Sequence, residues 1–336
     1  MNPRRPNDFS GDYKEGNVLQ WGRGLEPAET ALDGRAAPGT GVEERMESAP
    51  RNTRFSLVAC WKLTKPRLWL MLTYTAGIGF LASLKVHPGL LRDGILAIVA
   101  TALGTSGANA ITCYLDRDID SIMERTKKRP LPRGDVHPPT RALWLGLGLA
   151  ASSLVVLLIF AKYVAALIGL LGLIDNVLVY SVWLKRRSPL NIVLGSFSGG
   201  APVVVGWSVN ASILSPVPIL LASIVVLWIP SHIWSLAFRW RDDYSKAGIP
   251  MLTAIIDKRK AMLCVASTSF LIFLFSIVLV FAGPFGSTYL IVASIAGAVL
   301  LALTLWMTLR PYGAAPRVLF KYTSPYLAIL LAATVI

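Results

Sequence analysis

The chain has 336 residues, of which 54% are hydrophobic and only 15% are charged. A soluble domain usually carries about 25% charged residues, so this composition argues against a soluble globular protein. The net charge is +14. The three cysteines are widely spaced, and this spacing indicates neither a disulfide framework nor a cysteine metal site.

The first 53 residues are polar and contain no long apolar run. Such a segment cannot bury enough apolar surface to fold alone, so residues 1–53 are predicted to be a disordered tail. The remaining residues, 54–336, are predicted to form one transmembrane domain.

Nine apolar stretches follow the tail, each suited to crossing a hydrocarbon layer of about 30 Å as a helix. Within lipid the backbone must satisfy its own hydrogen bonds, which favours helices. We therefore predict an all-α fold, a polytopic transmembrane bundle of about nine spans. The predicted spans are 68–84, 94–115, 142–160, 164–184, 192–209, 217–238, 262–281, 289–309 and 318–336.

Positive charge gathers in alternate connections between these spans. The connections on one side contain 23 Lys or Arg residues, and those on the other side contain three. Because Lys and Arg mark cytoplasmic loops, the N-terminus is predicted to be cytoplasmic and the C-terminus outside. Nucleic-acid binding is the usual interpretation of a basic protein, but topology explains most of this charge. We expect a multi-pass protein of the cell membrane, with the lipid bilayer as its surroundings and no nucleic-acid partner.

The clearest chemical signal is an acidic segment, 116–120, at the end of the second predicted span. Asp116 and Asp120 are four residues apart and therefore lie on one helix face, whereas Asp118 points away. Paired carboxylates need a counter-ion, and Mg²⁺ takes oxygen ligands from one or two carboxylates and from substrate phosphates. An ordinary solvated loop is the competing interpretation.

Other residues can complete a magnesium–diphosphate site. Asn109 and Thr112 precede the acidic segment on the same side and are further candidate metal ligands. Asp242 and Asp243 follow the sixth predicted span in a loop on the same membrane side, and which of them faces the metal is open. Nearby bases can hold phosphate charge. The candidate diphosphate contacts are Arg117, Arg125, Lys128, Arg129, Lys185, Arg186, Arg239 and Lys246.

Together these motifs resemble the protohaem IX farnesyltransferase family, within the UbiA-type intramembrane prenyltransferases. The resemblance runs from about residue 61 to the C-terminus. It rests on segments 64–67, 116–131, 184–207, 230–232 and 243–252. It implies a transmembrane prenyltransferase that moves a farnesyl group from farnesyl diphosphate to the vinyl group of haem B. Water adds in the same reaction, and the products are haem O and diphosphate.

The resemblance also implies roles for particular residues. Asp116 and Asp120 are the expected catalytic Mg²⁺ ligands, and Asp243 is the expected second acidic contact, with Asp242 as a further ligand. Relatives often carry Asn where this chain has Thr112. The cation that forms when the allylic bond breaks needs a dry cavity with aromatic rings, for which Trp183, Trp234 and Trp240 are candidates.

His232 is a candidate haem contact, together with Trp234, because histidine often holds haem iron. A hydrogen-bonded structural histidine is equally open. Asp175 and Asn176 lie mid-span and are either functional or packed polar contacts. The expected later partners are a haem A synthase or terminal oxidase assembly.

Two alternatives to transfer onto haem stay open. The first is prenyl transfer to another acceptor, such as a quinone precursor, a chlorophyllide or an ether lipid. The second is a secondary transporter, although the acidic residues gather at one predicted membrane face rather than near the midplane.

Overall fold

The computed structural model describes residues 56–160, 162–310 and 313–336. Throughout these ranges the regular secondary structure is helical, without a strand, which confirms the predicted all-α fold. The predicted disordered tail, residues 1–53, lies outside the described residues.

Long helices occupy most of the predicted spans. They are α3 (Pro66–Leu84), α4 (Leu91–Leu115), α6 (Thr140–Phe160), α7 (Tyr163–Ile174) with its π-helical continuation η1 (Asp175–Leu184), α10 (Pro216–Arg239), α13 (Lys258–Ala282), α14 (Ser287–Leu309) and α15 (Ala315–Ala333). The shorter helices are α2 (Leu57–Leu63), α5 (Arg117–Ile122), α8 (Asn191–Gly195), α9 (Phe197–Ser208), α11 (Arg241–Lys246) and α12 (Leu252–Ile255).

Seven helices of the described chain are long and apolar enough to cross a bilayer, so this is a multi-pass integral membrane protein. Large apolar side chains on their outer faces are exposed, for example Trp144 at 70% and Phe281 at 83%. A hydrocarbon layer covers such surfaces without cost. The α8–α9 pair and α15 occupy the two other predicted spans, and the total of nine stays a prediction.

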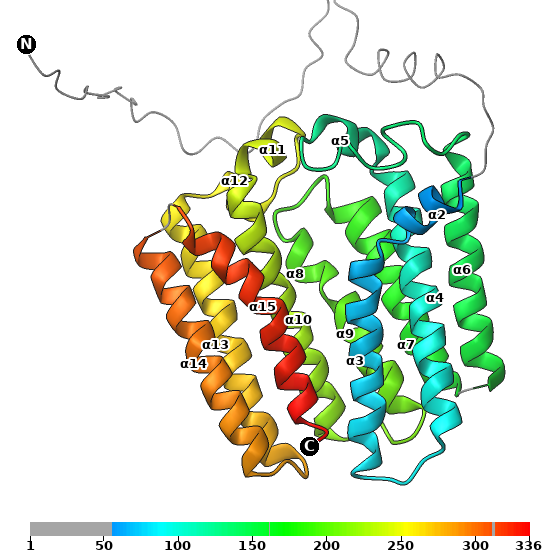
Figure 1. Cartoon of the computed structure of the whole chain (residues 1–336), viewed down its shortest axis with the longest axis vertical. Coiled ribbons are helices and arrows are strands. Elements are labelled where there is room, and N and C mark those ends of the chain that lie inside the picture. The colour runs from blue at the N-terminus through cyan, green and yellow to red at the C-terminus, as the bar shows by residue number, and fades with distance from the viewer. Residues whose placement is uncertain (1–55, 161, 311–312) are drawn as a thin grey trace, which may run out of the picture. The chain divides into compact units, whose positions relative to one another are not determined.

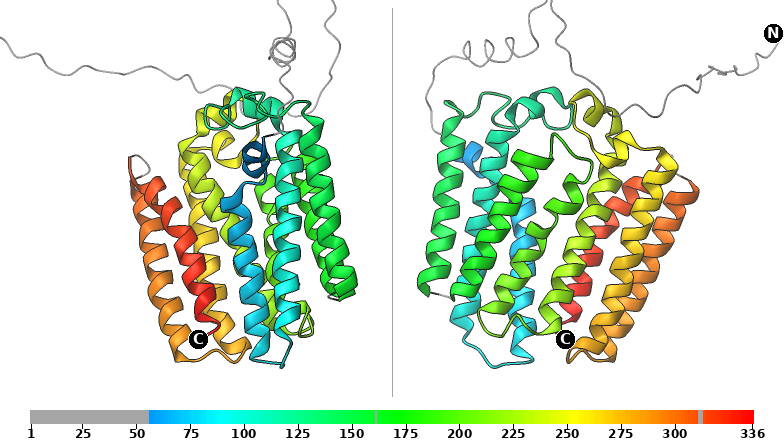
Figure 2. Two further views of the ribbon diagram at one scale, coloured as in Figure 1. Left: turned by 45° about the vertical axis from the view of Figure 1, so that its right-hand side comes forward. Right: turned by 180° about the vertical axis from the view of Figure 1, so that it is seen from behind.

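The helices stand side by side as a bundle (Figures 1 and 2). Contacts run from α3 to α4, α6, α7, α9 and α10, and then through α13 and α14 to α15, and α3 also packs on α9 and α10 on α15. Where α15 meets α3, the Tyr74 hydroxyl donates to the Ala328 carbonyl at 2.7 Å. Contacts between α3 and α15 are otherwise sparse.

The helices α3 and α9 approach each other closely because glycines face the neighbouring backbone. A Cβ atom on Gly206 would lie 1.8 Å from the Ala76 carbonyl oxygen, and one on Gly79 would lie 2.0 Å from that of Val203. Small residues allow this spacing between helices in lipid, where packing rather than water drives association.

The predicted span 192–209 is broken rather than continuous. The chain forms α8, passes through Ser196 and then starts α9. The carboxylate of Asp175, at the start of η1, accepts the Ser198 N–H at 2.7 Å in the first turn of α9. A carboxylate is stabilising at a helix N-terminus because it satisfies a free N–H group there. Asp175 therefore makes a packed polar contact, one of the two roles expected for it.

The short helices α2, α5, α11 and α12 gather at one end of the bundle (Figure 1). The opposite end carries the connection from α3 to α4 and the last turn of α15. Both acidic segments identified in the sequence, 116–120 and 242–243, therefore lie at the same end. This common end is what brings them into contact.

Candidate active site

The first acidic segment is positioned by a joint between two helices. α4 ends at Leu115 and α5 begins at Arg117, with Asp116 between them. The Asp120 N–H donates to the Asp116 carbonyl at 2.8 Å, so one helical turn connects the two residues across the joint. Asp116 and Asp120 are each 3% exposed, whereas Asp118 is exposed.

Each carboxylate of this segment has its own cation. Lys185 forms an ion pair with Asp116. The Arg129 Nη1 atom lies 2.9 and 2.7 Å from the two oxygens of Asp120. A buried carboxylate without a partner costs several kcal/mol, and these two bases offset that cost.

The two cations stay charged despite their partial burial. Burial alone lowers the pKa of Lys185, but the neighbouring Tyr180 and Asp116 outweigh it, and the pKa of Lys185 is raised. Burial likewise lowers the pKa of Arg129, and the Asp120 carboxylate outweighs this so that the pKa is raised. Arg129 also interacts with Asp116, and Lys185 with Asp120, so the four groups form one electrostatic cluster.

One carboxylate oxygen of the cluster is unpaired. The Asp116 Oδ1 atom is buried and has no hydrogen-bond partner among the described residues, whereas Lys185 holds the other oxygen. No group of three or more His, Cys, Asp or Glu side chains that could hold a metal occurs in the described part of the chain. Mg²⁺ is usually bound by one or two carboxylates plus water and substrate phosphates. The donor set of Asp116 and Asp120 fits that pattern.

Asn109 and Thr112 lie on α4 near this cluster, and both already have partners. The Asn109 side-chain amide donates to the Thr64 carbonyl at 3.0 Å. The Thr112 hydroxyl donates to the Asn109 carbonyl at 3.0 Å and accepts from Lys65 Nζ at 3.3 Å. These contacts bring Lys65, which was not among the predicted site residues, beside α4.

The second acidic segment contacts the first directly. Asp243 is 7% exposed, and its two carboxylate oxygens accept the backbone N–H groups of Glu124 at 2.9 Å and Arg125 at 3.2 Å. Asp242 is exposed. Asp243 is therefore the member of the pair that faces the first acidic loop, and it anchors the turn that follows α5.

The bases predicted to contact the diphosphate have different surroundings in the structure. Arg125 donates to the Tyr244 hydroxyl at 3.4 Å, beside Asp243. Arg117 donates to the Tyr114 carbonyl at 2.9 Å. The exposed Arg186 holds both oxygens of Asp118 at 2.7 Å each, and Lys128 and Lys246 are exposed. Arg239 lines a different cavity, between α10 and α15.

His232 and Trp234, the predicted haem contacts, lie on α10. The imidazole is stacked between Trp228 and Phe320, with ring centroids 4.6 and 4.4 Å away. Its Nδ1 atom is hydrogen-bonded to the Thr323 hydroxyl at 2.7 Å. The Trp234 indole is buried, and its N–H has no partner among the described residues. Of the other two tryptophans considered, Trp183 is exposed and Trp240 is half-buried.

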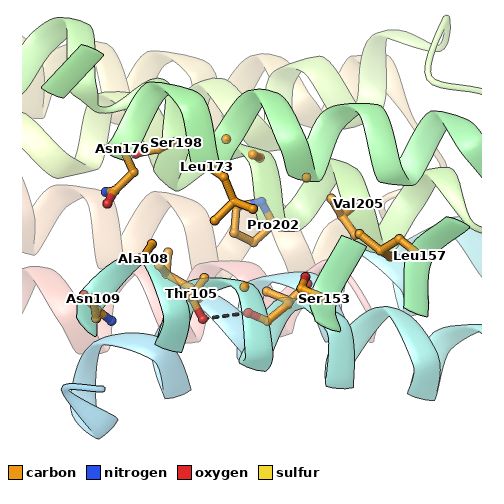
Figure 3. Close-up of a pocket in the computed structure, with 16 residues that line it drawn as sticks. Thr105, Ala108, Asn109, Ser153, Leu157, Leu173, Asn176, Ser198, Pro202 and Val205 are labelled. Carbon is orange, nitrogen blue, oxygen red and sulfur yellow. Dashed lines mark hydrogen bonds between the residues drawn. The ribbon is translucent and has the colours of Figure 1, made fainter. Parts of the chain in front are cut away.

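A narrow cavity of about 80 Å³ extends into the membrane region beside α4 (Figure 3). Asn109 and Asn176 lie at one end of the cavity, and Leu157 and Val205 lie at the other. Its walls come from α4, α6, α7, η1 and α9, with contributions from α3. Asn109 is about two helical turns before Asp116, so the cavity lies deeper in the bundle than the acidic cluster, and none of its described lining residues belongs to that cluster.

These features define a class of protein: a multi-pass helical membrane protein with a buried carboxylate–cation cluster at one end and a cavity beneath it. The model of the UbiA prenyltransferase family matches residues 70–328, and the chain belongs to this family. The resemblance identified in the sequence is thereby confirmed, and the transporter alternative receives no support.

Individual relatives agree with this assignment. The chain is 44% identical over 270 residues to the protoheme IX farnesyltransferase of Thermoplasma volcanium, which covers 80% of this chain and 93% of that protein. A digeranylgeranylglyceryl phosphate synthase structure is similar with a TM-score of 0.69 and 19% identity, over 83% of this chain and 97% of the other. A UbiA homologue of Archaeoglobus fulgidus bound to DMAPP and Mg²⁺ gives a TM-score of 0.60 with 16% identity, over 80% and 98% of the two chains.

Sequence reasoning missed several side chains around the acidic cluster. Tyr180 lies against Lys185 of the cluster, whereas Lys65 contacts Thr112 and Tyr244 contacts Arg125. Lys65 belongs to a segment that carries the family resemblance, and that was the only signal that pointed to it. The two tyrosines gave none, because an aromatic residue near a span end is expected at any membrane interface.

Proposed function

We propose that the chain transfers a farnesyl group from farnesyl diphosphate to a vinyl carbon of haem B in a Mg²⁺-dependent reaction. The observation that carries this proposal is the buried Asp116–Lys185 and Asp120–Arg129 cluster, with one carboxylate oxygen unsatisfied, above a cavity that enters the membrane. The acceptor is inferred from the names of the relatives, such as the farnesyltransferase of Thermoplasma volcanium.

Asp116 and Asp120 would hold the metal ion, with Asp243 fixing the loop beside them. When bound, Mg²⁺ neutralises charge on the diphosphate and promotes its departure. Lys185, Arg129 and Arg125 supply fixed positive charge where negative charge develops on the leaving group. The cavity beneath the cluster excludes water from the apolar chain of the substrate.

The reaction balances as follows. The bond between C1 of the farnesyl group and the diphosphate oxygen breaks, and the diphosphate leaves with the electron pair. The terminal vinyl carbon forms a new bond to C1, which leaves a cation on the carbon next to the haem ring. Water adds to that cation and loses a proton, which gives a hydroxyethylfarnesyl side chain.

The proposed organisation follows the charge distribution of the sequence. Residues 54–336 form the catalytic domain, with the acidic cluster on the cytoplasmic side of the cell membrane, and residues 1–53 form a separate tail. The product has a free hydroxyl and a new apolar chain, which suits a later step toward haem A or a terminal oxidase.

Purified protein in lipid nanodiscs tests the proposal. Farnesyl diphosphate, haem B and Mg²⁺ are expected to yield haem O and diphosphate, measured by mass spectrometry, with no product when the metal is chelated. Parallel reactions with a quinone precursor, a chlorophyllide and a prenyl-accepting glycerol phosphate test the other acceptors. Transfer to one of these molecules, with no haem O formed, would refute haem B as the acceptor.

A further inference from the structure

A second cavity, lined in part by bases, lies between α10 and α15, apart from the acidic cluster. Its volume is about 230 Å³, and the described residues that line it belong to these two helices. Three of them are the bases Arg239, Arg317 and Lys321, and none of the described lining residues is acidic. No ion pair is recorded for these three bases within the described chain.

One lining residue, Phe320, belongs to a stack of aromatic rings. The Phe320 ring stacks on His232 at 4.4 Å between centroids. His232 in turn stacks on Trp228 at 4.6 Å. The lining therefore combines three bases with one aromatic ring that this stack holds in place.

This combination selects a particular kind of ligand. A diphosphate–metal complex needs carboxylates to hold the metal, and this cavity offers none. Carboxylates pair directly with guanidinium and ammonium groups. A flat apolar molecule with carboxylates on one edge can pair with the bases and also contact the Phe320 ring. It would also keep those carboxylates at the membrane face, because the cavity lies at the end of α10 and the start of α15.

We propose that the cavity between α10 and α15 binds the two carboxylates of the prenyl acceptor through Arg239, Arg317 and Lys321, with Phe320 against its ring system. This inference rests on the proposed function, in which the acceptor is haem B, a macrocycle with two propionates. It assigns Arg239 to the acceptor rather than to the diphosphate, and it assigns Arg317, Phe320 and Lys321 to substrate binding.

The test is equilibrium binding without farnesyl diphosphate. Full-length protein in nanodiscs of neutral lipid is titrated with haem B and with its dimethyl ester, in which both carboxylates are blocked. The wild type is expected to bind haem B about tenfold more tightly than the ester. The R317Q/K321Q double variant is expected to bind haem B about tenfold more weakly and to lose the preference over the ester.

A matched control is the R259Q/K260Q double variant. It removes two exposed bases from the first turn of α13, away from the residues that line the cavity. Wild-type affinity and wild-type discrimination are expected. Equal affinity of wild type and R317Q/K321Q for haem B, or equal affinity of the wild type for haem B and its ester, would overturn the proposal.

Two further outcomes separate this inference from its alternatives. Thermal melts in separate nanodiscs that contain anionic lipid test lipid binding. If R317Q/K321Q loses the stabilisation by anionic lipid but keeps wild-type affinity for haem B, the cavity holds lipid headgroups and the proposal is wrong. Turnover tests the proposed function separately. If the wild type binds haem B more tightly than the ester but makes no haem O, the carboxylate site is supported and the proposed function is wrong. If the wild type makes haem O but binds haem B and the ester equally, the proposed function is supported and the carboxylate site is wrong.

Discussion

Asp116, Asp118 and Asp120 share one short segment but have different surroundings. The outer two are buried beside Lys185 and Arg129, whereas Asp118 is exposed and bound to Arg186. Burial removes solvent screening, so charge at the outer positions acts more strongly on a bound diphosphate. The three acids therefore provide a comparison of similar chemistry in different environments.

Asp116→Asn and Asp120→Asn are each expected to reduce Mg²⁺-dependent diphosphate release by about a thousandfold, because each removes a buried charge that holds the metal. Asp118→Asn is the control, and its rate should stay within about threefold of wild type, because exposed pairs contribute little. Release of labelled diphosphate measures the rates, and gel filtration in detergent checks folding. Wild-type rates for Asp116→Asn would remove its assigned role.

Lys185 is hydrogen-bonded to one oxygen of Asp116. Lys185→Gln leaves a buried carboxylate without its cation, which should destabilise the protein by about 3–5 kcal/mol. Added Mg²⁺ should then raise the melting temperature of this variant more than that of the wild type. Arg186→Gln removes the exposed pair with Asp118 and a hydrogen bond to the Leu115 carbonyl, but it leaves both buried carboxylates paired, so it should respond to Mg²⁺ like the wild type. A smaller Mg²⁺ response in Lys185→Gln than in wild type would contradict a metal site at Asp116.

Asp243 acts on the backbone of the first loop rather than on a side chain. Asp243→Ala removes the acceptor of the Glu124 and Arg125 N–H groups, and the expected loss of stability is about 2–3 kcal/mol. The exposed neighbour provides the control, Asp242→Ala, with a change of about 0.5 kcal/mol or less. Thermal unfolding of both variants measures the difference. Equal losses for the two would mean that the loop contact contributes nothing.

At the scale of helices, hydrophobic pattern and length predicted the elements well. The predicted span 68–84 corresponds to Pro66–Leu84, and 142–160 to Thr140–Phe160. Pattern failed where tertiary contacts are involved: Asp175 accepts the Ser198 N–H from 23 residues away, and periodicity predicted neither this contact nor the break at Ser196. The π-helical winding of η1 likewise left no sequence signal, because its residues are as apolar as those of an α-helix.

The same limit applied to the site. The four-residue spacing of Asp116 and Asp120 predicted their common orientation correctly. Spacing could not predict that Arg129 pairs with Asp120 and Lys185 with Asp116, because the second pair comes from separate helices. Nor could it separate Arg239 from the other bases, since only the packing of α15 on α10 shows which cavity it lines.

The close approach of α3 and α9 makes a prediction at this scale. Gly206→Ala would place a methyl group 1.8 Å from the Ala76 carbonyl oxygen, so the helices must separate, and a loss of more than about 2 kcal/mol is expected. Gly148 on α6 has nothing within 4 Å of its Cβ position, so Gly148→Ala should leave stability unchanged or raise it by up to about 1 kcal/mol. Thermal melts in one detergent compare the two, and equal stability would refute the tight contact.

For the whole molecule, the two ends of the bundle should face different compartments. Ser245 is exposed in the end that holds the acidic cluster, and His87 is exposed in the connection between α3 and α4. A membrane-impermeant maleimide should label a His87→Cys variant in intact cells. It should label a Ser245→Cys variant only after permeabilisation. The reverse pattern would place the acidic cluster outside and refute the proposed orientation.

We expect the buried carboxylate–cation cluster to be the binding site for a metal–diphosphate. The most direct measurement is an experimental structure with Mn²⁺ in place of Mg²⁺ and an unreactive thio analogue of farnesyl diphosphate, in which the anomalous signal locates the metal. The metal is expected between Asp116, Asp120 and the diphosphate, with Lys185 moved from Asp116 to a phosphate oxygen and the apolar chain in the cavity beside Asn109. A metal and diphosphate bound elsewhere, with the Lys185–Asp116 pair intact, would show that this cluster is not the metal–diphosphate site.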